Sequence, residues 1–495
     1  MSAVIDERNL ILAAEDCPPD QFENLHKFSQ HDLEIMAKLE AHGPVLLRGG
    51  RGSGKSALMI AAARRLAPST PSAPAVGIYL SLRHLPLLRS TGEAYERFLL
   101  EILIRAVKVT ALHLGAEFES EVSIAGVQQA LGELSISVGK RIVLFFDDAA
   151  HIGREASLQE FFDIFRTLSS NTVSCKAAIY PGVTRFGTRF DIYNDATVVE
   201  VARNEESGGF SDFFYEVARA RHPALIERVK APRNMSGAEY FGFVGQAVLG
   251  NMRAFVFAME EMQKSSGVDA QGFTLLTLVL KNLAANYYWP LLEELRPKLG
   301  AYEPFVVPSQ EVAEILFTRC GTFGRNYALV HREIVARFAK PLEILEYAGF
   351  IARRDASMAM KSGGRGTRYA LNLCNLLEKV AGARLTQSLY EDWSPVFSGY
   401  VEFHRAGSEF TDIETPLERL DAELGVLSLP IETLRKGTVY PYGLTESKVH
   451  LLEAAGYRTI GDLAAADEAA LMRLDTIGEV HAKRIKLVAY QAIWM

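Results

Sequence analysis

The chain has 495 residues, 48% of them hydrophobic and 23% charged, with a net charge of −7. A chain of this length and composition forms two to four globular domains, and its negative charge restricts any nucleic-acid surface to a local patch. The four cysteines are widely separated and have no metal-ligand spacing, which argues against a zinc site or a disulfide framework. The chain opens without a secretory signal and has no membrane-length apolar run, so we expect a cytoplasmic protein that does not enter a membrane.

Residues 1–204 alternate strand and helix patterns, which predicts a parallel sheet covered by helices. The strand signals lie at 45–48, 76–82, 142–146, 176–180 and 197–201, with helical periods between them at 94–107 and 158–168. Loops above the carboxyl ends of such strands form the binding site. We therefore expect a nucleotide-hydrolase core here.

A glycine-rich segment directly follows the first predicted strand. It matches the phosphate-binding loop and consists of Gly49, Gly50, Arg51, Gly52, Ser53, Gly54, Lys55 and Ser56, with a helical stretch starting at Ala57. In such a loop the backbone amides surround phosphates, the lysine contacts the outer phosphates and the serine hydroxyl binds Mg²⁺. ATP is the expected nucleotide, because no Asn-Lys-x-Asp guanine signature follows. The alternative is a glycine-rich turn without a ligand.

The third predicted strand, an apolar run over 142–146, ends in Asp147 and Asp148. An acidic pair after a buried strand is the Walker B arrangement. Asp147 would then hold the magnesium shell and Asp148 would orient the attacking water. A solvated strand end is the alternative.

From 205 to 304 the pattern is helical, with segments at 210–220, 239–249, 253–262 and 275–299, which predicts a lid. Gly250 and Asn251 precede a helix whose first turn contains Arg253. An arginine in that position can reach the γ-phosphate; the alternative is a surface arginine after a helix stop.

Residues 305–375 fit a winged helix: helices at 310–319, 331–338 and 342–348, the last opened by Pro341, then a ribbon of 350–354 and 367–371. Between Arg325 and Arg368 there are nine basic residues and four acidic ones. This excess favours DNA phosphate contacts, chiefly by Arg353, Arg354, Arg365 and Arg368. Glu343 and Glu346 on the third helix disfavour base readout. A winged helix that binds only protein is the alternative.

Residues 376–440 are predicted to be a connector, and 441–495 two helix-hairpin-helix turns. In such turns the amides at a helix start can hold a DNA phosphate without reading sequence. Gly478, His481, Lys483, Arg484 and Lys486 would form the second hairpin. A protein-docking domain is the alternative. The segment resembles the C-terminal domain of the RNA polymerase alpha subunit.

Over about residues 20–375 the loop, acidic pair, lid and winged helix together resemble the origin-recognition-like branch of AAA+ ATPases. The resemblance implies that Arg253 is a sensor-2 arginine, that Thr184 lies near the sensor-1 position, and that Arg185 or Arg189 is an inter-subunit arginine finger. It also implies self-association in the ATP state. Initiators usually have Asp-Glu where this chain has Asp147-Asp148, and Asp-Asp is common in STAND signalling ATPases.

The expected fold is a multidomain α/β protein: a P-loop AAA+ core, a helical lid, a winged helix and an all-α C-terminal domain. The expected activity is hydrolysis of ATP to ADP and phosphate. The leading hypothesis is a DNA-engaging switch that controls a partner effector, in phage defence or a mobile element. The alternative is a STAND-like signalling ATPase whose winged-helix and C-terminal domains bind protein and not DNA.

Overall fold

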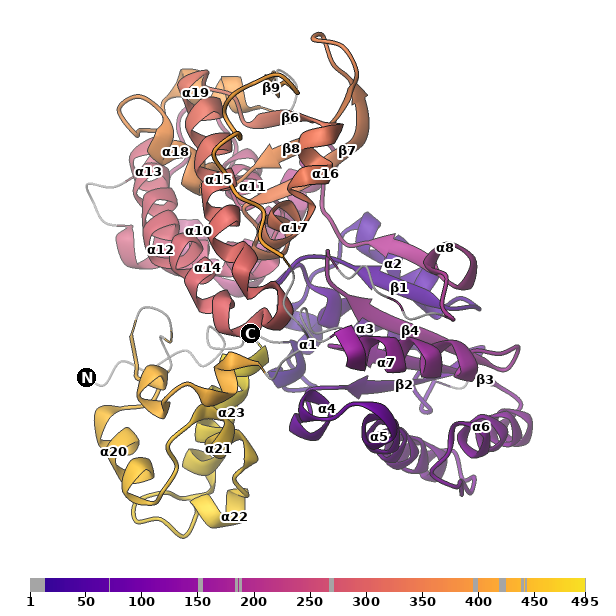
Figure 1. Ribbon diagram of the computed structural model, residues 1–495. Coiled ribbons are helices and arrows are strands. Elements are labelled where there is room, and N and C mark those ends of the chain that lie inside the picture. The colour runs from indigo at the N-terminus through magenta and orange to yellow at the C-terminus, as the bar shows by residue number, and fades with distance from the viewer. Residues whose placement is uncertain are drawn as a thin grey trace.

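The computed structural model describes residues 14–70, 72–149, 155–182, 186, 189–266, 271–394, 399–417, 424–437, 440 and 443–494. Figure 1 shows an α/β core (indigo to magenta), a second body of helices with a small sheet (pink to orange) and a C-terminal helical module (yellow). All four cysteines are buried and free. Within the described ranges, no helix combines the length and apolar character that a membrane crossing requires.

The core is a five-stranded parallel sheet in the order β2-β3-β4-β1-β5. Its strands are β1 (Val45–Arg48), β2 (Ala75–Ser81), β3 (Arg141–Asp147), β4 (Val173–Ile179) and β5 (Thr197–Glu200). β3 and β4 lie inside the sheet with helices on both faces, which explains their nearly continuous apolar sequence. The sheet confirms the predicted P-loop AAA+ core, and the strand bounds differ from the predicted ones by at most three residues.

Helices cover both faces of this sheet. One face packs on the apolar residues of α5 (Gly92–His113), α6 (Ile124–Val138) and α7 (Glu155–Leu168). The other packs on α2 (Gln30–Glu40) and α3 (Lys55–Arg65). The remaining short core elements are the 3-10 turn Ala14–Asp16, α1 (Phe22–Leu25), α4 (Leu85–Arg89) and α8 (Ile192–Asp195).

The lid region is helical as predicted. It contains α9 (Phe210–Arg221), α10 (Pro223–Arg228), α11 (Gly237–Ala247), α12 (Met252–Ser265) and α13 (Gly272–Leu283). The segment predicted to be helical over 275–299 is helical up to Lys298, with interruptions in its α-helical winding. After α13 the chain forms a π-helical turn, Ala284–Tyr288, then α14 (Trp289–Leu295) and the 3-10 turn Arg296–Lys298. Pro290 and Pro297 cannot donate backbone hydrogen bonds, which accounts for the interruptions.

The winged helix follows a 3-10 turn, Gly300–Phe305. It consists of α15 (Val306–Thr322), β6 (Tyr327–His331), α16 (Arg332–Arg337), α17 (Ala339–Ala348), β7 (Ile351–Ala359) and β8 (Arg365–Leu371). α17 begins at Ala339, so Pro341 lies within its first turn and does not open it, a small correction. One apolar cluster runs from Phe210 to Ile413, so the lid and winged helix share a core.

The segment predicted as a connector is more structured than expected. It contains most of α18 (Leu373–Lys379), then α19 (Gln387–Trp393) and β9 (Tyr400–Phe403), and β9 pairs in parallel with β6. The second sheet therefore has the order β7-β8-β6-β9. Short 3-10 turns at Gly425–Ser428 and Ile431–Leu434 follow.

The C-terminal module contains α20 (Glu446–Ala454), α21 (Ile460–Ala465), α22 (Glu468–Leu471) and α23 (Glu479–Trp494). Its apolar cluster includes Leu85 and Leu88 of α4, so the module packs directly on the parallel-sheet core. Its short helices are compatible with two helix-hairpin-helix turns, and that assignment stays a prediction.

Candidate nucleotide-binding site

The phosphate-binding loop lies between the end of β1 and the start of α3. Gly52 and Gly54 have φ angles of +78° and +100°, a conformation that glycine adopts without strain. The lid comes very close to the loop, since a Cβ on Gly52 would lie 2.7 Å from Arg253 Cβ. The backbone N–H of Arg253 also donates to the Gly52 carbonyl at 3.2 Å. The lid therefore contacts the phosphate-binding loop directly at Gly52, through both the side chain and the backbone of Arg253.

Lys55 is held over the loop. Its Nζ donates to the carbonyls of Gly49 at 2.7 Å and Gly50 at 3.1 Å, and lies 4.0 Å from the centre of the Tyr180 ring. Burial lowers the pKa of Lys55 to about 8. A phosphate in the cavity would stabilise the charged ammonium, which is the role predicted for this lysine.

Three carboxyl groups meet at the end of β3. Oxygens of Glu15, Asp147 and Asp148 all lie within 4.8 Å of one another. The Tyr79 hydroxyl lies 2.6 Å from Glu15 Oε1 and 2.7 Å from Asp147 Oδ2. Burial raises the pKa of Glu15 to about 7. Carboxylate oxygens are hard ligands of the kind that Mg²⁺ prefers, and one or two of them together with substrate phosphates hold the ion.

Asp147 and Ser56 fit the predicted magnesium site, because the Ser56 hydroxyl is close enough to the Asp147 carboxyl to act on its pKa. Burial of Asp147, with Asp148 next to it, raises the pKa of Asp147. A divalent cation would offset this cost of burying a carboxylate. Asp148 has a φ of +52°, an uncommon conformation for a residue other than glycine, and accepts a 3.1 Å hydrogen bond from the Tyr180 hydroxyl.

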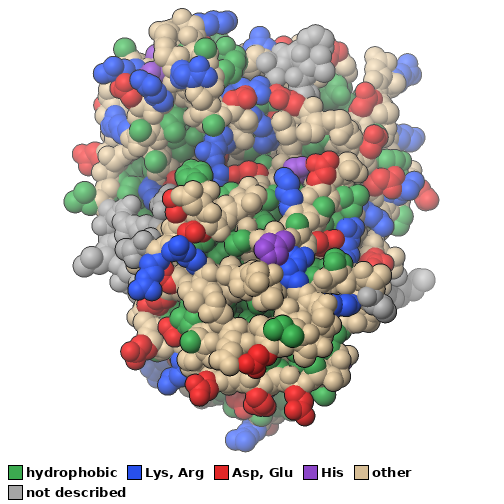
Figure 2. Space-filling model, turned by 90° about the vertical axis from the view of Figure 1, so that its right-hand side faces the viewer, with side chains coloured by type: hydrophobic (Ala, Val, Ile, Leu, Met, Phe, Trp, Pro, Cys, Tyr) green, Lys and Arg blue, Asp and Glu red, His purple; other side chains and the backbone are tan. Residues whose placement is uncertain are grey.

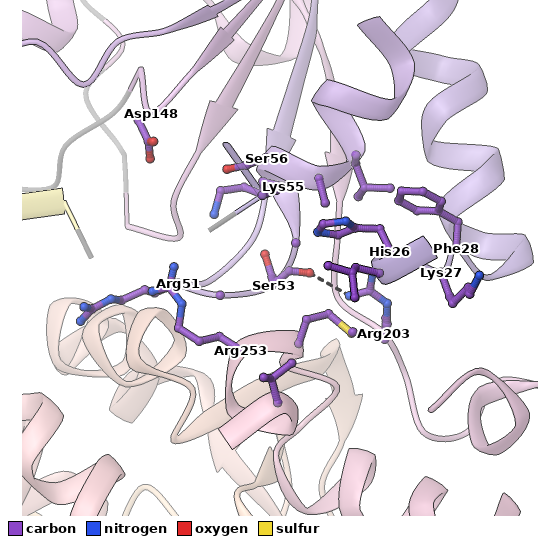
Figure 3. Close-up of a pocket in the computed structure, with 18 of the residues that line it drawn as sticks. His26, Lys27, Phe28, Arg51, Ser53, Lys55, Ser56, Asp148, Arg203 and Arg253 are labelled. Atoms are coloured by element: carbon purple, nitrogen blue, oxygen red, sulfur yellow. Dashed lines mark hydrogen bonds between the residues drawn. The ribbon is translucent and has the colours of Figure 1, made fainter. Parts of the chain in front are cut away.

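Buried arginines line the same cavity. Arg51 and Arg253 run beside one another below Lys55, across the cavity from Asp148 (Figure 3). Arg203 donates to the Ser53 carbonyl at 2.8 Å and pairs with buried Asp32 at 2.7 Å. Arg253, the residue predicted as sensor 2, therefore lies at the loop beside Arg51, and an anionic ligand would neutralise both, whereas Asp32 already neutralises Arg203.

His26, Lys27 and Phe28 line the other end of the cavity (Figure 3). Val256 of α12 and Trp494 of α23 contribute further apolar surface. Apolar and aromatic side chains beside a phosphate loop provide a suitable environment for a nucleobase. The C-terminal module therefore supplies part of the wall of this cavity.

Two predicted residues, Thr184 and Arg185, lie outside the described residues. Arg189 is exposed, and its carbonyl accepts a hydrogen bond from Arg166, so the structure does not bring it to this cavity. Glu15, Arg83 and Arg203 belong to the site, but the sequence did not predict them. Only Arg83 had a usable signal, since it follows a core strand as Asp148 does.

The wing prediction needs correction at two arginines. Arg354 is buried and pairs with Glu205, while Arg368 pairs with Asp355 at 2.5 Å and with Glu206 at 3.0 Å. Neither guanidinium is available for a DNA phosphate. Glu205 and Glu206, which lie outside the counted segment, and Asp355, which lies inside it, neutralise them. Exposed Arg365 bonds the Ser357 side chain at 2.6 Å.

The second hairpin also differs in part from the prediction. Lys486 is buried and donates to the carbonyls of Ala464 and Ala466, where it caps the end of α21. His481, Lys483 and Arg484 are exposed, although Lys483 pairs with Glu479 at 2.6 Å. On the face drawn in Figure 2, basic and acidic side chains are interspersed, so that face has no extended basic surface.

Comparison with known proteins adds distant structural likenesses. No protein-family model and no curated protein sequence matches this chain. The Walker-type ATPase PABY2304 of Pyrococcus abyssi is 15% identical, with a TM-score of 0.45 over 73% of this chain and 98% of that one. ORC2 of Aeropyrum pernix, solved as ADPNP–ADP complexes, is 11% identical, with a TM-score of 0.35 over 75% of this chain and 96% of that one. Cdc6p of Pyrobaculum aerophilum is 12% identical, with a TM-score of 0.32 over 79% of this chain and 98% of that one. At these TM-scores no activity passes from those proteins to this chain.

Proposed function

We propose that this protein binds Mg²⁺–ATP, hydrolyses it to ADP and phosphate, and uses the change to alter how its lid, winged helix and C-terminal module are arranged. The observation that carries the proposal is the cavity itself. A phosphate loop, an acidic strand end and buried lid and loop arginines converge there from separate parts of the chain.

Each group has a defined task in this proposal. The loop amides and Lys55 hold the outer phosphates, Ser56 and Asp147 would hold Mg²⁺, and Asp148 orients the attacking water. Mg²⁺ supplies charge neutralisation on the phosphates. Arg253 joins the lid to the nucleotide, because its own backbone is bonded to the loop at Gly52.

Direct contacts connect the nucleotide cavity to the winged helix and to the C-terminal module, so a change of bound nucleotide can alter their positions. The Arg51 N–H donates to the Tyr347 carbonyl of α17 at 3.0 Å, and the Tyr180 and Tyr347 rings meet edge to face. Trp494 brings α23 to the same cavity. These contacts support a switch in which the winged helix and C-terminal module respond to ATP.

DNA is the partner that we propose for these modules, through backbone contacts by the exposed cations Lys361, Arg365, Lys483 and Arg484. Control of a partner effector, in phage defence or a mobile element, remains a proposal that rests on the family resemblance alone. Arg354 and Arg368 form ion pairs with acidic residues of this chain. This favours the alternative, a signalling ATPase whose modules bind protein.

Two substitutions test the ATPase proposal. Lys55→Ala should weaken ATP binding by about 10-fold or more, because a charged hydrogen-bond donor to the phosphates is lost. Asp148→Asn should keep ATP binding and slow hydrolysis about 100-fold or more. Calorimetric titration and phosphate release measure the two effects. If the Lys55 variant binds ATP as well as the original protein, the site assignment is wrong.

A further inference from the structure

The loop residue Arg51 has a buried, incompletely paired guanidinium. Its side chain is only 9% exposed, yet Nε and Nη1 have no hydrogen-bond partner among the residues that the structure describes. The ion pair from Nη2 to Glu294 Oε1 of α14 is long at 3.5 Å. Burial of an arginine without partners costs free energy, so this group needs an anion.

Glu294 does not supply that anion fully, because it has a closer partner. Lys298 Nζ lies 2.6 Å from the same Glu294 oxygen and is buried as well. One carboxylate therefore serves two buried cations, and the shorter contact belongs to Lys298. Arg51 is left with excess positive charge inside the cavity.

A second arginine with buried, unpaired side-chain nitrogens lies next to Arg51. Arg253 Nε and Nη1 are also buried and have no partner within the described part of the chain, and both guanidiniums line the nucleotide cavity (Figure 3). The two cations repel one another, and the charge of Arg51 is one cause of a lowered Arg253 pKa, after burial. Across the cavity from both lies Asp148, which accepts a hydrogen bond from the Tyr180 hydroxyl (Figure 3). The pair thus faces the end of the cavity where hydrolysis would occur.

The backbone of Arg51 is fixed from two sides. Its N–H is bonded to α17 through Tyr347, and its carbonyl accepts a 2.6 Å hydrogen bond from Asn251 Nδ2 at the start of α12. The neighbouring Gly50 has no room for a side chain, since a Cβ there would lie 2.9 Å from the Glu346 carbonyl. The guanidinium is therefore presented from a rigid position.

We propose that Arg51 binds the terminal phosphate of ATP together with Arg253, so that the phosphate loop itself carries a residue that distinguishes ATP from ADP. This inference rests on the proposed function. Lys55 and the loop amides reach the β-phosphate, which ATP and ADP share, as well as the terminal one, whereas Arg51 contacts only the terminal phosphate. When Arg51 binds that phosphate, its ion pair with Glu294 also changes, and Glu294 connects the loop to the lid.

The test compares ATP and ADP affinities of the full chain by calorimetric titration with Mg²⁺. Arg51→Ala should weaken ATP binding by about 10-fold or more and change ADP affinity by less than about 3-fold, as expected for one charged hydrogen-bonding group. Equal losses for ATP and ADP, or no loss for either, would overturn the proposal. Lys55→Ala, by contrast, should weaken the binding of both ATP and ADP. If the original protein binds neither ATP nor ADP, the proposed function itself is wrong, and not only the role of Arg51.

Two further variants separate phosphate binding from a structural role. Glu294→Gln removes the ion pair and keeps Arg51, so the ATP-to-ADP preference should stay within about 3-fold of the original. A loss as large as that of Arg51→Ala would make Arg51 a lid anchor and contradict the proposal. If the alanine variant does not fold, Arg51→Lys decides. It keeps one charge but not the forked geometry, so the preference for ATP should fall by about 3-fold or more, and an unchanged preference would overturn the proposal.

Discussion

Arg83 Nε lies 2.6 Å from Asp148 Oδ2, so the residue predicted to orient the attacking water is held by a cation from the neighbouring strand end. Arg83 also pairs with Glu15 at 3.0 Å. It lies two residues after the end of β2, and β2 and β3 pair in register up to the Ser81–Asp147 pair. The three carboxyl groups at the end of β3 therefore have a positively charged side chain, that of Arg83, among them.

Arg83→Gln should slow ATP hydrolysis by about 10-fold or more, because Asp148 loses the partner that orients it. The Mg²⁺ concentration needed for half-maximal activity should fall, since a competing cation has gone from the carboxylates. Phosphate release across a Mg²⁺ series measures both effects. Arg97→Gln, at an exposed position on α5, is the matched control. Unchanged hydrolysis in the Arg83 variant would remove its proposed role.

His26 predicts a pH dependence of stability. Burial, followed by the charge of Arg221, lowers the pKa of His26 from 6.5 to about 4. Between these values the unfolded chain binds a proton that the folded protein does not, so stability falls as the pH drops from 6.5 toward 4. His26→Gln should flatten this part of the profile in urea unfolding. His113→Gln, at an exposed site, should leave the profile unchanged, and identical profiles for all three proteins would contradict the prediction.

DNA binding, if the modules contact phosphates, should be independent of sequence and weaken steeply with salt. Replacement of exposed Lys361 and Arg365 by alanine should reduce the slope of log affinity against log salt by up to about 1.8, or two contacts. Fluorescence anisotropy with unrelated duplexes measures the slope. Arg97→Ala on the core is the control. No binding at low salt, with ATP or without it, would favour the protein-docking alternative.

Self-association should require ATP if an arginine from one subunit completes the site of the next. Arg189 is exposed, which leaves its side chain accessible to a neighbour. Light scattering should show a larger species with ATP than with ADP, and Arg189→Ala should slow hydrolysis in that species by about 1,000-fold if it is the finger. A monomer in every nucleotide state would refute this prediction.

The sequence predicted the parts of the site that local pattern determines. The phosphate loop, Asp147 and Asp148 are contiguous motifs, and Arg253 follows a glycine that stops a helix. Contacts between distant segments were not predictable, such as that between Arg83 and Asp148, 65 positions apart. The count of basic residues in the wing was misleading for the same reason, because Glu205 neutralises Arg354 from 149 positions away.

β9 has a practical consequence for anyone who works with shorter pieces of this protein. It pairs with β6 from Tyr327↔Tyr400 to Val330↔Phe403, and so covers an edge of the winged-helix sheet. A fragment cut near residue 375, where the sequence placed the boundary, would expose that row of amides and carbonyls to other chains. Such a fragment would be prone to aggregate, and retained β9 would keep the edge closed.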